Sequence, residues 1–165
     1  MWNFVKRLCL AGLGAVAGLA VAGISAAGVA AQPTVVVLTQ VACQFLEAEI
    51  GIDRNFTAAR KADCEGVNFK TGAARLAEAT MLRLKPGEYI FRITNKDVPY
   101  SLGFLLRSKG YNWANPIHKL TKTSISGGGM TTGKTLEYTV TLKPGEYVYS
   151  CPLNTTPDYR LIVGG

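Results

Sequence analysis

The stretch LKPGEYVYSCPLNTTPDYRLIV, residues 142–163, combines strand-forming and turn-forming residues in an order that indicates the fold. Residues 145–150 are rich in aromatic and β-branched side chains, as strands are, and Cys151 closes this run. The segment PLNTTPDY that follows consists mainly of turn formers, and YRLIV at its end is again typical of a strand. The stretch therefore predicts a strand, a tight loop that begins at Cys151, and a terminal strand.

The hexapeptide LKPGEY occurs twice, at residues 84–89 and 142–147. Two copies are too few for a repeat architecture, so a local explanation is preferred. Proline fixes its own φ and glycine accepts a positive φ, which together suit a tight turn. Each copy is therefore interpreted as a turn that enters a core strand.

Further strands are expected on both sides of these turns. Residues 81–95 alternate with period two, which places Leu82 and Leu84 on one face and Tyr89, Phe91 and Ile93 on another. Additional strands are predicted at residues 34–41, 101–107 and 134–151. Many short strands with Gly/Pro turns and no strand–helix alternation favour an all-β sandwich or barrel of two sheets.

Two segments do not follow this pattern. Residues 43–79 are richer in Ala, Glu, Lys and Arg, with glycine breaks, and predict a short helix or two within loops. Residues 109–133 are polar and rich in Gly, Thr and Asn, and we expect long loops with little regular structure there. The glycines at 127–129 are interpreted as a flexible turn, since no phosphate-binding pattern follows them.

The N-terminus is typical of an export signal. Lys6 and Arg7 precede an uncharged run from residue 8 to residue 31, and small residues before Gln32 suit cleavage after Ala31. The alternative is an uncleaved membrane anchor, because a bilayer needs about 20 apolar residues. Either interpretation predicts a periplasmic or secreted domain at residues 32–165, released or anchored through its N-terminal segment.

The charge pattern argues against nucleic acid as a partner. The chain has 18 basic and 11 acidic residues, and removal of Lys6 and Arg7 leaves 16 against 11, a net charge of +5. The basic residues are scattered and are not interleaved with aromatics along a groove-like run. A solvated surface is the expected role of these charges, with an acidic protein partner or anionic lipid as alternatives.

Three cysteines remain in the exported domain. Cys43 and Cys64 lie close in sequence in the same segment, and an oxidising compartment favours their pairing. Such a disulfide would staple residues 43–79. Cys151 is then unpaired, either buried and inert or present for its chemistry.

Residues 81–163 resemble the cupredoxin family of small blue copper proteins. The resemblance is carried by ITNKDVPYSLGF at 93–104 and by LEYTVTLKPGEYVYSCPLN at 136–154. The positions that match the family framework are Asn95, Phe104, Gly145, Tyr147 and Cys151. The resemblance implies a cupredoxin-like Greek-key β-sandwich, with residues 43–79 as a helical and loop elaboration.

The family's copper ligands are a Cys, two His and an axial Met, because a thiolate and two imidazoles hold copper in a trigonal plane. The resemblance places Tyr100 at the first His position, Asn154 at the second, and Tyr159 near the axial Met. Only Cys151 matches a ligand. The resemblance therefore implies that the ordinary site is degenerate.

Other site chemistry has few candidates. Cys151 with His118 and Met130 could form a soft site for Cu(I), although their spacing does not select it. His118 is the only histidine, and no hydrolase motif, zinc pattern or convincing carboxylate pair accompanies it; Glu47 and Glu49 are merely two residues apart. No catalytic residue and no small-molecule substrate are predicted.

Two functional hypotheses follow. The first is a non-enzymatic binding or accessory scaffold without a cofactor, acting on a periplasmic or membrane-associated protein. Its recognition surface is predicted on the segment 109–133, at Tyr111 and Trp113, because loops on a rigid sandwich often carry function. The second is a copper-binding or electron-transfer protein with an atypical site centred on Cys151.

Overall fold

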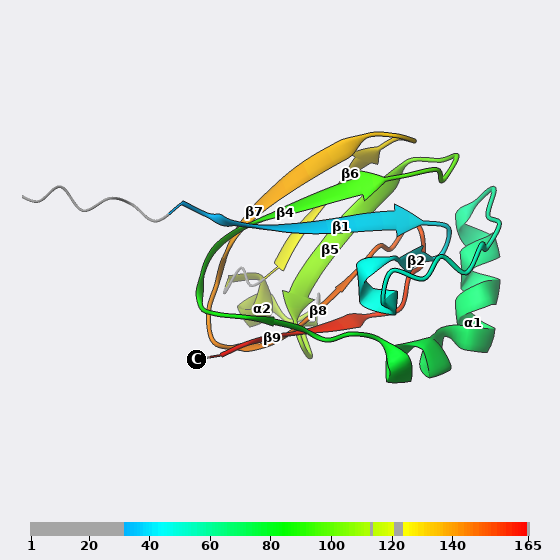
Figure 1. The fold of residues 1–165 in the computed structure, drawn as a ribbon. Coiled ribbons are helices and arrows are strands. Elements are labelled where there is room, and N and C mark those ends of the chain that lie inside the picture. Colours follow the sequence, from blue (N-terminus) through cyan, green and yellow to red (C-terminus); the bar gives the residue numbers. More distant parts are fainter. Residues whose placement is uncertain (1–31, 113, 121–123, 165) are drawn as a thin grey trace, which may run out of the picture. The chain divides into compact units, whose positions relative to one another are not determined.

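The computed structural model describes residues 32–112, 114–120 and 124–164. The predicted signal segment, residues 1–31, and Trp113 lie outside these residues. Within them the chain forms an all-β sandwich of two sheets, as Figure 1 shows, which confirms the fold class expected from the sequence. Residues 31–165 make up one compact unit with its own core, so residues 32–165 are a suitable folding unit for experiments.

Most of the strands lie at the predicted positions, but those at Gln44–Phe45 and Ser124–Met130 fall in segments where the sequence predicts loops or helices. In chain order they are β1 (Thr34–Val41), β2 (Gln44–Phe45), β3 (Leu82–Leu84), β4 (Gly87–Asn95), β5 (Leu102–Ser108), β6 (Ser124–Met130), β7 (Thr135–Leu142), β8 (Gly145–Ser150) and β9 (Tyr159–Val163). One sheet has the order β2-β1-β4-β7, and the other has the order β3-β9-β8-β5-β6. Strands β1 and β4 are parallel neighbours and end side by side. The residues that follow them, although far apart in sequence, therefore lie at the same end of the sandwich.

The core lies between the two sheets. Tyr89, Phe91 and Ile93 are buried on the inner face of β4, as the period-two pattern predicts. Phe91 stacks against Phe104 of the opposite sheet, with ring centroids 5.5 Å apart. Large aromatic rings bury more apolar surface than any other side chains, and this contact joins the sheets at their centre.

The two LKPGEY copies form the same turn. In the first, the Tyr89 hydroxyl donates a hydrogen bond to the carbonyl of Lys85 at 2.8 Å. In the second, the Tyr147 hydroxyl donates to the carbonyl of Lys143 at 3.0 Å. Each tyrosine thus closes back over the turn that precedes its strand. The recurrence of the hexapeptide has a local structural cause, as the sequence suggested.

Replacing Tyr89 by phenylalanine should lower the free energy of unfolding by about 0.5–1.5 kcal/mol, because one intramolecular hydrogen bond is lost while the ring stays. Tyr147→Phe should lower it by at least as much, because the Tyr147 hydroxyl also accepts the N–H of Lys143 at 3.3 Å. Urea unfolding of residues 32–165 measures the change. Tyr138→Phe is the control, since its hydroxyl makes only a long contact of 3.4 Å to Gly127. Equal stability of all three variants would show that the two turns do not depend on their tyrosines.

The prediction of long loops at residues 109–133 is wrong in part. The segment contains the short helix α2 (Pro116–Leu120) and strand β6, which pairs with β5. Glycines rarely indicate strands, yet here Gly127 is required: a Cβ on Gly127 would lie 2.7 Å from the Tyr138 ring, and one on Gly103 would lie 2.5 Å from the Gly127 carbonyl. The glycine run is therefore a strand under close packing and not a flexible turn.

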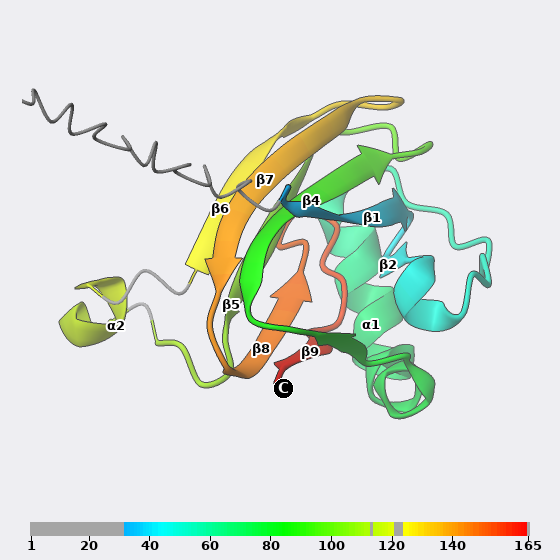
Figure 2. The same cartoon turned by 60° about the vertical axis from the view of Figure 1, so that its left-hand side comes forward.

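The prediction of one or two short helices in residues 43–79 also needs correction. A 3₁₀ turn, η1 (Glu47–Glu49), is followed by one helix of 18 residues, α1 (Lys61–Glu78). The Asp63 carboxylate accepts the N–H groups of Ala59 and Arg60 and so satisfies backbone donors where α1 begins. Figures 1 and 2 show α1 at the end of the sandwich where β1 ends, and α2 on the other side.

The predicted disulfide between Cys43 and Cys64 is confirmed, and it joins the β1–β2 turn to α1. Among the described residues, no helix is long and apolar enough to cross a membrane.

Candidate functional site

Cys151 lies directly after β8 and is fully buried. Its Sγ accepts the backbone N–H of Gly103 at 3.4 Å and that of Asn154 at 3.2 Å. Its own N–H donates to Oγ1 of Thr156 at 2.8 Å, which closes the loop 151–156. Burial raises the pKa of the Cys151 thiol, although the backbone donors oppose this shift. The cysteine is therefore a neutral, enclosed thiol at neutral pH.

Asn154, at the position that the resemblance assigns to the second imidazole, binds backbone groups with both ends of its amide. Oδ1 accepts the N–H of Cys43 at 2.8 Å, and Nδ2 donates to the carbonyl of Val41 at 2.8 Å. Nδ2 also lies 3.4 Å from Oε1 of Gln40. The side chain is fully buried. Asn154 thus ties the loop after β8 to the β1–β2 turn.

Tyr100, at the position assigned to the first imidazole, is held by Asn95. The Asn95 amide donates to the carbonyls of Val98, Tyr100 and Met130, and its Oδ1 accepts the Val98 N–H at 2.9 Å. This fixes the connection between β4 and β5. Burial and the proximity of Cys151 raise the pKa of Tyr100, so its phenol stays neutral.

The disulfide lies against both of these positions. Sγ of Cys64 is 3.3 Å from Oδ1 of Asn154 and 3.7 Å from the Tyr100 hydroxyl. A disulfide sulfur has no hydrogen to donate, so the contact with Asn154 is a packing contact, and the Tyr100 hydroxyl is the only possible donor of the second. Helix α1 and its disulfide therefore cover the place where Cys151, Asn154 and Tyr100 meet.

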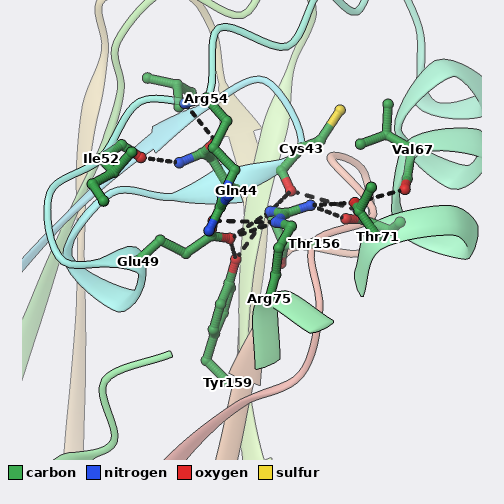
Figure 3. A network of polar contacts seen from close by, with 12 residues as sticks. Cys43, Gln44, Glu49, Ile52, Arg54, Val67, Thr71, Arg75, Thr156 and Tyr159 are labelled. Atoms are coloured by element: carbon green, nitrogen blue, oxygen red, sulfur yellow. Dashed lines mark hydrogen bonds and ion pairs between the residues drawn. The ribbon is translucent and has the colours of Figure 1, made fainter. Parts of the chain in front are cut away.

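Tyr159 belongs to a neighbouring network, shown in Figure 3. Its hydroxyl donates to the carboxylate of Glu49, which also forms a buried ion pair with Arg75 of α1. Nε of Arg75 lies 2.9 Å from Oε1 of Glu49, and one Nη donates to the carbonyl of Cys43 at 3.0 Å. Arg75 thereby connects α1, η1 and the disulfide turn through one guanidinium.

The Glu49 carboxylate stays ionised within this network. Burial raises its pKa, but the hydrogen bonds from Arg75, Tyr159 and Arg54 outweigh that effect and hold the pKa of Glu49 below its ordinary value of 4.5. Arg54 binds the same carboxylate through Nε at 2.7 Å from the solvent side. The partners of Glu49 are Arg75 on α1, Tyr159 on β9 and Arg54 in the segment between η1 and α1. The network is therefore best explained as the attachment of α1 to the sandwich.

The structure separates His118 from Cys151. His118 lies on α2, which follows the Ser108 end of β5, and its Nδ1 accepts the Asn112 N–H at 2.9 Å. Cys151 contacts Gly103 at the opposite end of this strand. The five residue steps from Gly103 to Ser108 span about 17 Å, so these two candidates do not share a site.

Met130 lies at the Cys151 end, since it is paired with Leu102 and is fully buried. Of the positions singled out in the sequence, the structure thus brings together Cys151, Asn154 and Tyr100, and it places Met130 in the same core cluster as Cys151. Among the described residues, no three or more His, Cys, Asp or Glu side chains are grouped as metal ligands. At the position that the resemblance assigns to the second imidazole, the Asn154 amide is already bonded at both ends, so it does not fit as a ligand of an ordinary copper site.

The sequence did not indicate Gln40 or Arg75, and it indicated Glu49 only as half of an unconvincing carboxylate pair. Gln40 is fully buried and donates through Nε2 to the carbonyl of Gly103 at 2.8 Å. Helical spacing offered one signal: Cys64, Asn68 and Arg75 share a face once residues 61–78 are taken as a single helix. The glycines within this segment concealed that pattern.

The fold and this end of it define a two-sheet β-sandwich with a buried cysteine loop, and solved structures with similar folds include blue copper proteins. Auracyanin B has a TM-score of 0.49 at 14% identity, covering 83% of this chain and 94% of its own. Auracyanin A, a "blue" copper protein from Chloroflexus aurantiacus, has a TM-score of 0.47 at 13% identity, with coverages of 81% and 100%.

A third similar structure is Fet3p, a multicopper oxidase that functions in iron import. Its TM-score is 0.36 at 15% identity, covering 82% of this chain and 32% of its own. No protein-family profile and no curated protein matches the chain. These structural likenesses concern the fold alone.

Proposed function

We propose that this protein is an exported, non-enzymatic scaffold of cupredoxin-like fold that binds a protein partner and lacks an ordinary type 1 copper site. The observation that carries the proposal is the bonding of Asn154. Its amide uses both its donor and its acceptor on the β1–β2 turn, at the position where the resemblance requires an imidazole. A disulfide and a helix are built over the same place.

Export is supported by two independent features. The basic and apolar N-terminal segment has the composition of a signal peptide or an anchor. The Cys43–Cys64 disulfide is the kind of bond that persists in the periplasm or outside the cell. Released and membrane-anchored forms are both compatible with the proposal.

The recognition surface is proposed on the segment between β5 and β6, at Tyr111 and Trp113. Tyr111 packs its ring against His118 of α2, with centroids 5.7 Å apart. Figure 2 shows α2 on the side of the sandwich away from α1. Aromatic residues supply much of the binding energy at protein interfaces. A short helix with an exposed Ile117 continues this surface.

Capture of a partner from the native compartment tests the proposal. Tagged full-length protein is cross-linked in cells, and the wild type is compared with Tyr111→Ala/Trp113→Ala. Phe69→Ala is the control, because Phe69 is an exposed aromatic on α1. Loss of a defined cross-linked species in the double variant alone is the expected result. Unchanged capture by the double variant contradicts the proposed surface.

One observation favours the copper-binding alternative. Met130 pairs with Leu102 and Cys151 accepts the N–H of Gly103, so a thioether residue and a thiol both lie beside the start of β5. These are the ligand types that Cu(I) prefers. Titration of residues 32–165 with Cu(I) against a competing chelator distinguishes the hypotheses. Binding that disappears in both Cys151→Ser and Met130→Leu would support the alternative, and no competition by the wild type supports the scaffold.

A further inference from the structure

Strand β1 has a free edge along most of its length. On one side it pairs with β4 from Thr34 to Gln40, and on the other it pairs with β2 only at Gln40 and Val41. No strand of the described chain lies beside residues 34–39 on that second side. An open edge is a template for pairing with another chain.

The direction of the free backbone groups follows from Thr39. Its N–H donates to the Glu47 carboxylate at 2.7 Å, and its carbonyl accepts the N–H of Leu46 at 3.0 Å, both on the side away from β4. Because backbone groups alternate along a strand, those of Val35 and Val37 point to the same side. Pro33, the next residue in this alternation, has no N–H. The free edge is thus limited to Val35 and Val37.

This edge lacks the protection that natural edge strands commonly have. The sequence from Gln32 to Leu46 contains no charged residue. The side chains of Val35 and Val37 project from the outer face of the sheet and are 41% and 52% exposed. Charged side chains usually blunt such an edge, and here two exposed valines stand in their place, while Val36 between them packs against the core.

We propose that two copies of this chain pair edge to edge through β1, antiparallel and centred on Val36. In this register Val35 of each copy lies opposite Val37 of the other, and each pair exchanges two backbone hydrogen bonds. Both free residues of both copies are then satisfied. The arrangement is two-fold symmetric and closes as a dimer, joining the β1-containing sheets into one continuous sheet.

Neither of the two neighbouring registers pairs all the free backbone groups. A shift of two residues in one direction places Pro33, which has no donor, opposite Val37. A shift in the other direction places Val35 opposite Thr39, whose backbone groups are already bonded to Glu47 and Leu46. The ends of the free edge therefore select the register centred on Val36. A second copy fits this edge because it presents the same two donors and acceptors in reverse order.

Sedimentation equilibrium of residues 32–165 across a concentration series tests the proposal. We expect a monomer–dimer equilibrium that is weak, because the interface is short. Val35→Lys/Val37→Lys places like charges opposite one another twice and should weaken association by about tenfold or more. Val35→Lys/Val37→Glu places opposite charges together in the same register and should retain the dimer.

Thr139→Lys/Thr141→Lys is the charge-matched control, since both threonines are exposed on β7, which does not adjoin β1 in the sheet. This control should dimerise as the wild type does. The proposal is overturned if the wild type is monomeric at every concentration, if it forms open-ended assemblies, or if the Lys/Glu variant associates as weakly as the Lys/Lys variant. Circular dichroism of each variant shows whether the fold is kept.

Discussion

Replacing Arg75 by methionine should lower the free energy of unfolding by at least about 3 kcal/mol, because removing one partner leaves a buried carboxylate without its main counter-charge. The Arg75 and Glu49 side chains are 3% and 1% exposed, so water cannot compensate the loss. Methionine keeps most of the aliphatic volume, which confines the change to charge and hydrogen bonding. Denaturant unfolding of residues 32–165 measures the effect.

Arg92→Met is the matched control. Arg92 pairs with Glu137 on the open face of the sheet, where the side chains are 46% and 48% exposed. Exposed pairs contribute about 0–1 kcal/mol, so this variant should stay close to the wild type. If Arg75→Met were no more destabilising than Arg92→Met, the network of Figure 3 would not be what holds α1 on the sandwich.

Lowering the pH should narrow the difference in the free energy of unfolding between Arg75→Met and the wild type. The pKa of Glu49 is below its ordinary value of 4.5 in the folded protein, so ionised Glu49 stabilises the fold fully above about that pH. This contribution is lost as the pH falls through the lowered folded value. In the variant, protonation of Glu49 relieves the unpaired charge. Unfolding measured from pH 7 down to pH 3 should show the two proteins converging.

Replacing Asn154 by leucine should lower the free energy of unfolding by about 2–6 kcal/mol, because two buried backbone groups each lose a partner at a cost of about 1–3 kcal/mol. These groups are the Cys43 N–H and the Val41 carbonyl. Leucine has a similar volume, so packing changes less than hydrogen bonding does. Thermal or denaturant unfolding gives the magnitude.

The same variant should make Cys151 react with a thiol reagent under native conditions. In the wild type Cys151 is fully buried beneath the loop that Asn154 anchors, so its labelling should follow global unfolding. Leu153→Ala is the control, because Leu153 belongs to the same loop but is 40% exposed. If Asn154→Leu were as stable as the wild type and its Cys151 were labelled no faster, the amide would not be what anchors the loop.

Much of the sandwich could be predicted because its strands are amphipathic. Alternation along residues 87–95 places Tyr89, Phe91 and Ile93 inward, and the structure buries all three. The Pro-Gly turns also carry local signals that need no tertiary information. Strand β6 was missed because its glycines are selected by close packing with Tyr138 and Gly103, which alternation does not reveal.

The site could be predicted only in part. The positions Cys151, Asn154 and Tyr100 were identified through the resemblance, and the disulfide through the pairing of nearby cysteines. No local pattern indicates that the disulfide and α1 cover these positions, because that depends on how residues 43–79 pack on the sandwich. The partners of Asn154 at Val41 and Cys43 are more than 100 residues away in sequence, beyond the reach of any local pattern.

The central claim is that the place of the ordinary copper site is occupied by structural bonds. The most direct measurement is the copper content of residues 32–165, produced in a copper-supplemented periplasm, together with the visible absorption spectrum. A folded, colourless protein with far less than one copper per chain is the predicted result. Stoichiometric copper with an intense thiolate charge-transfer band that disappears in Cys151→Ser would contradict the claim and move the copper-binding alternative to first place.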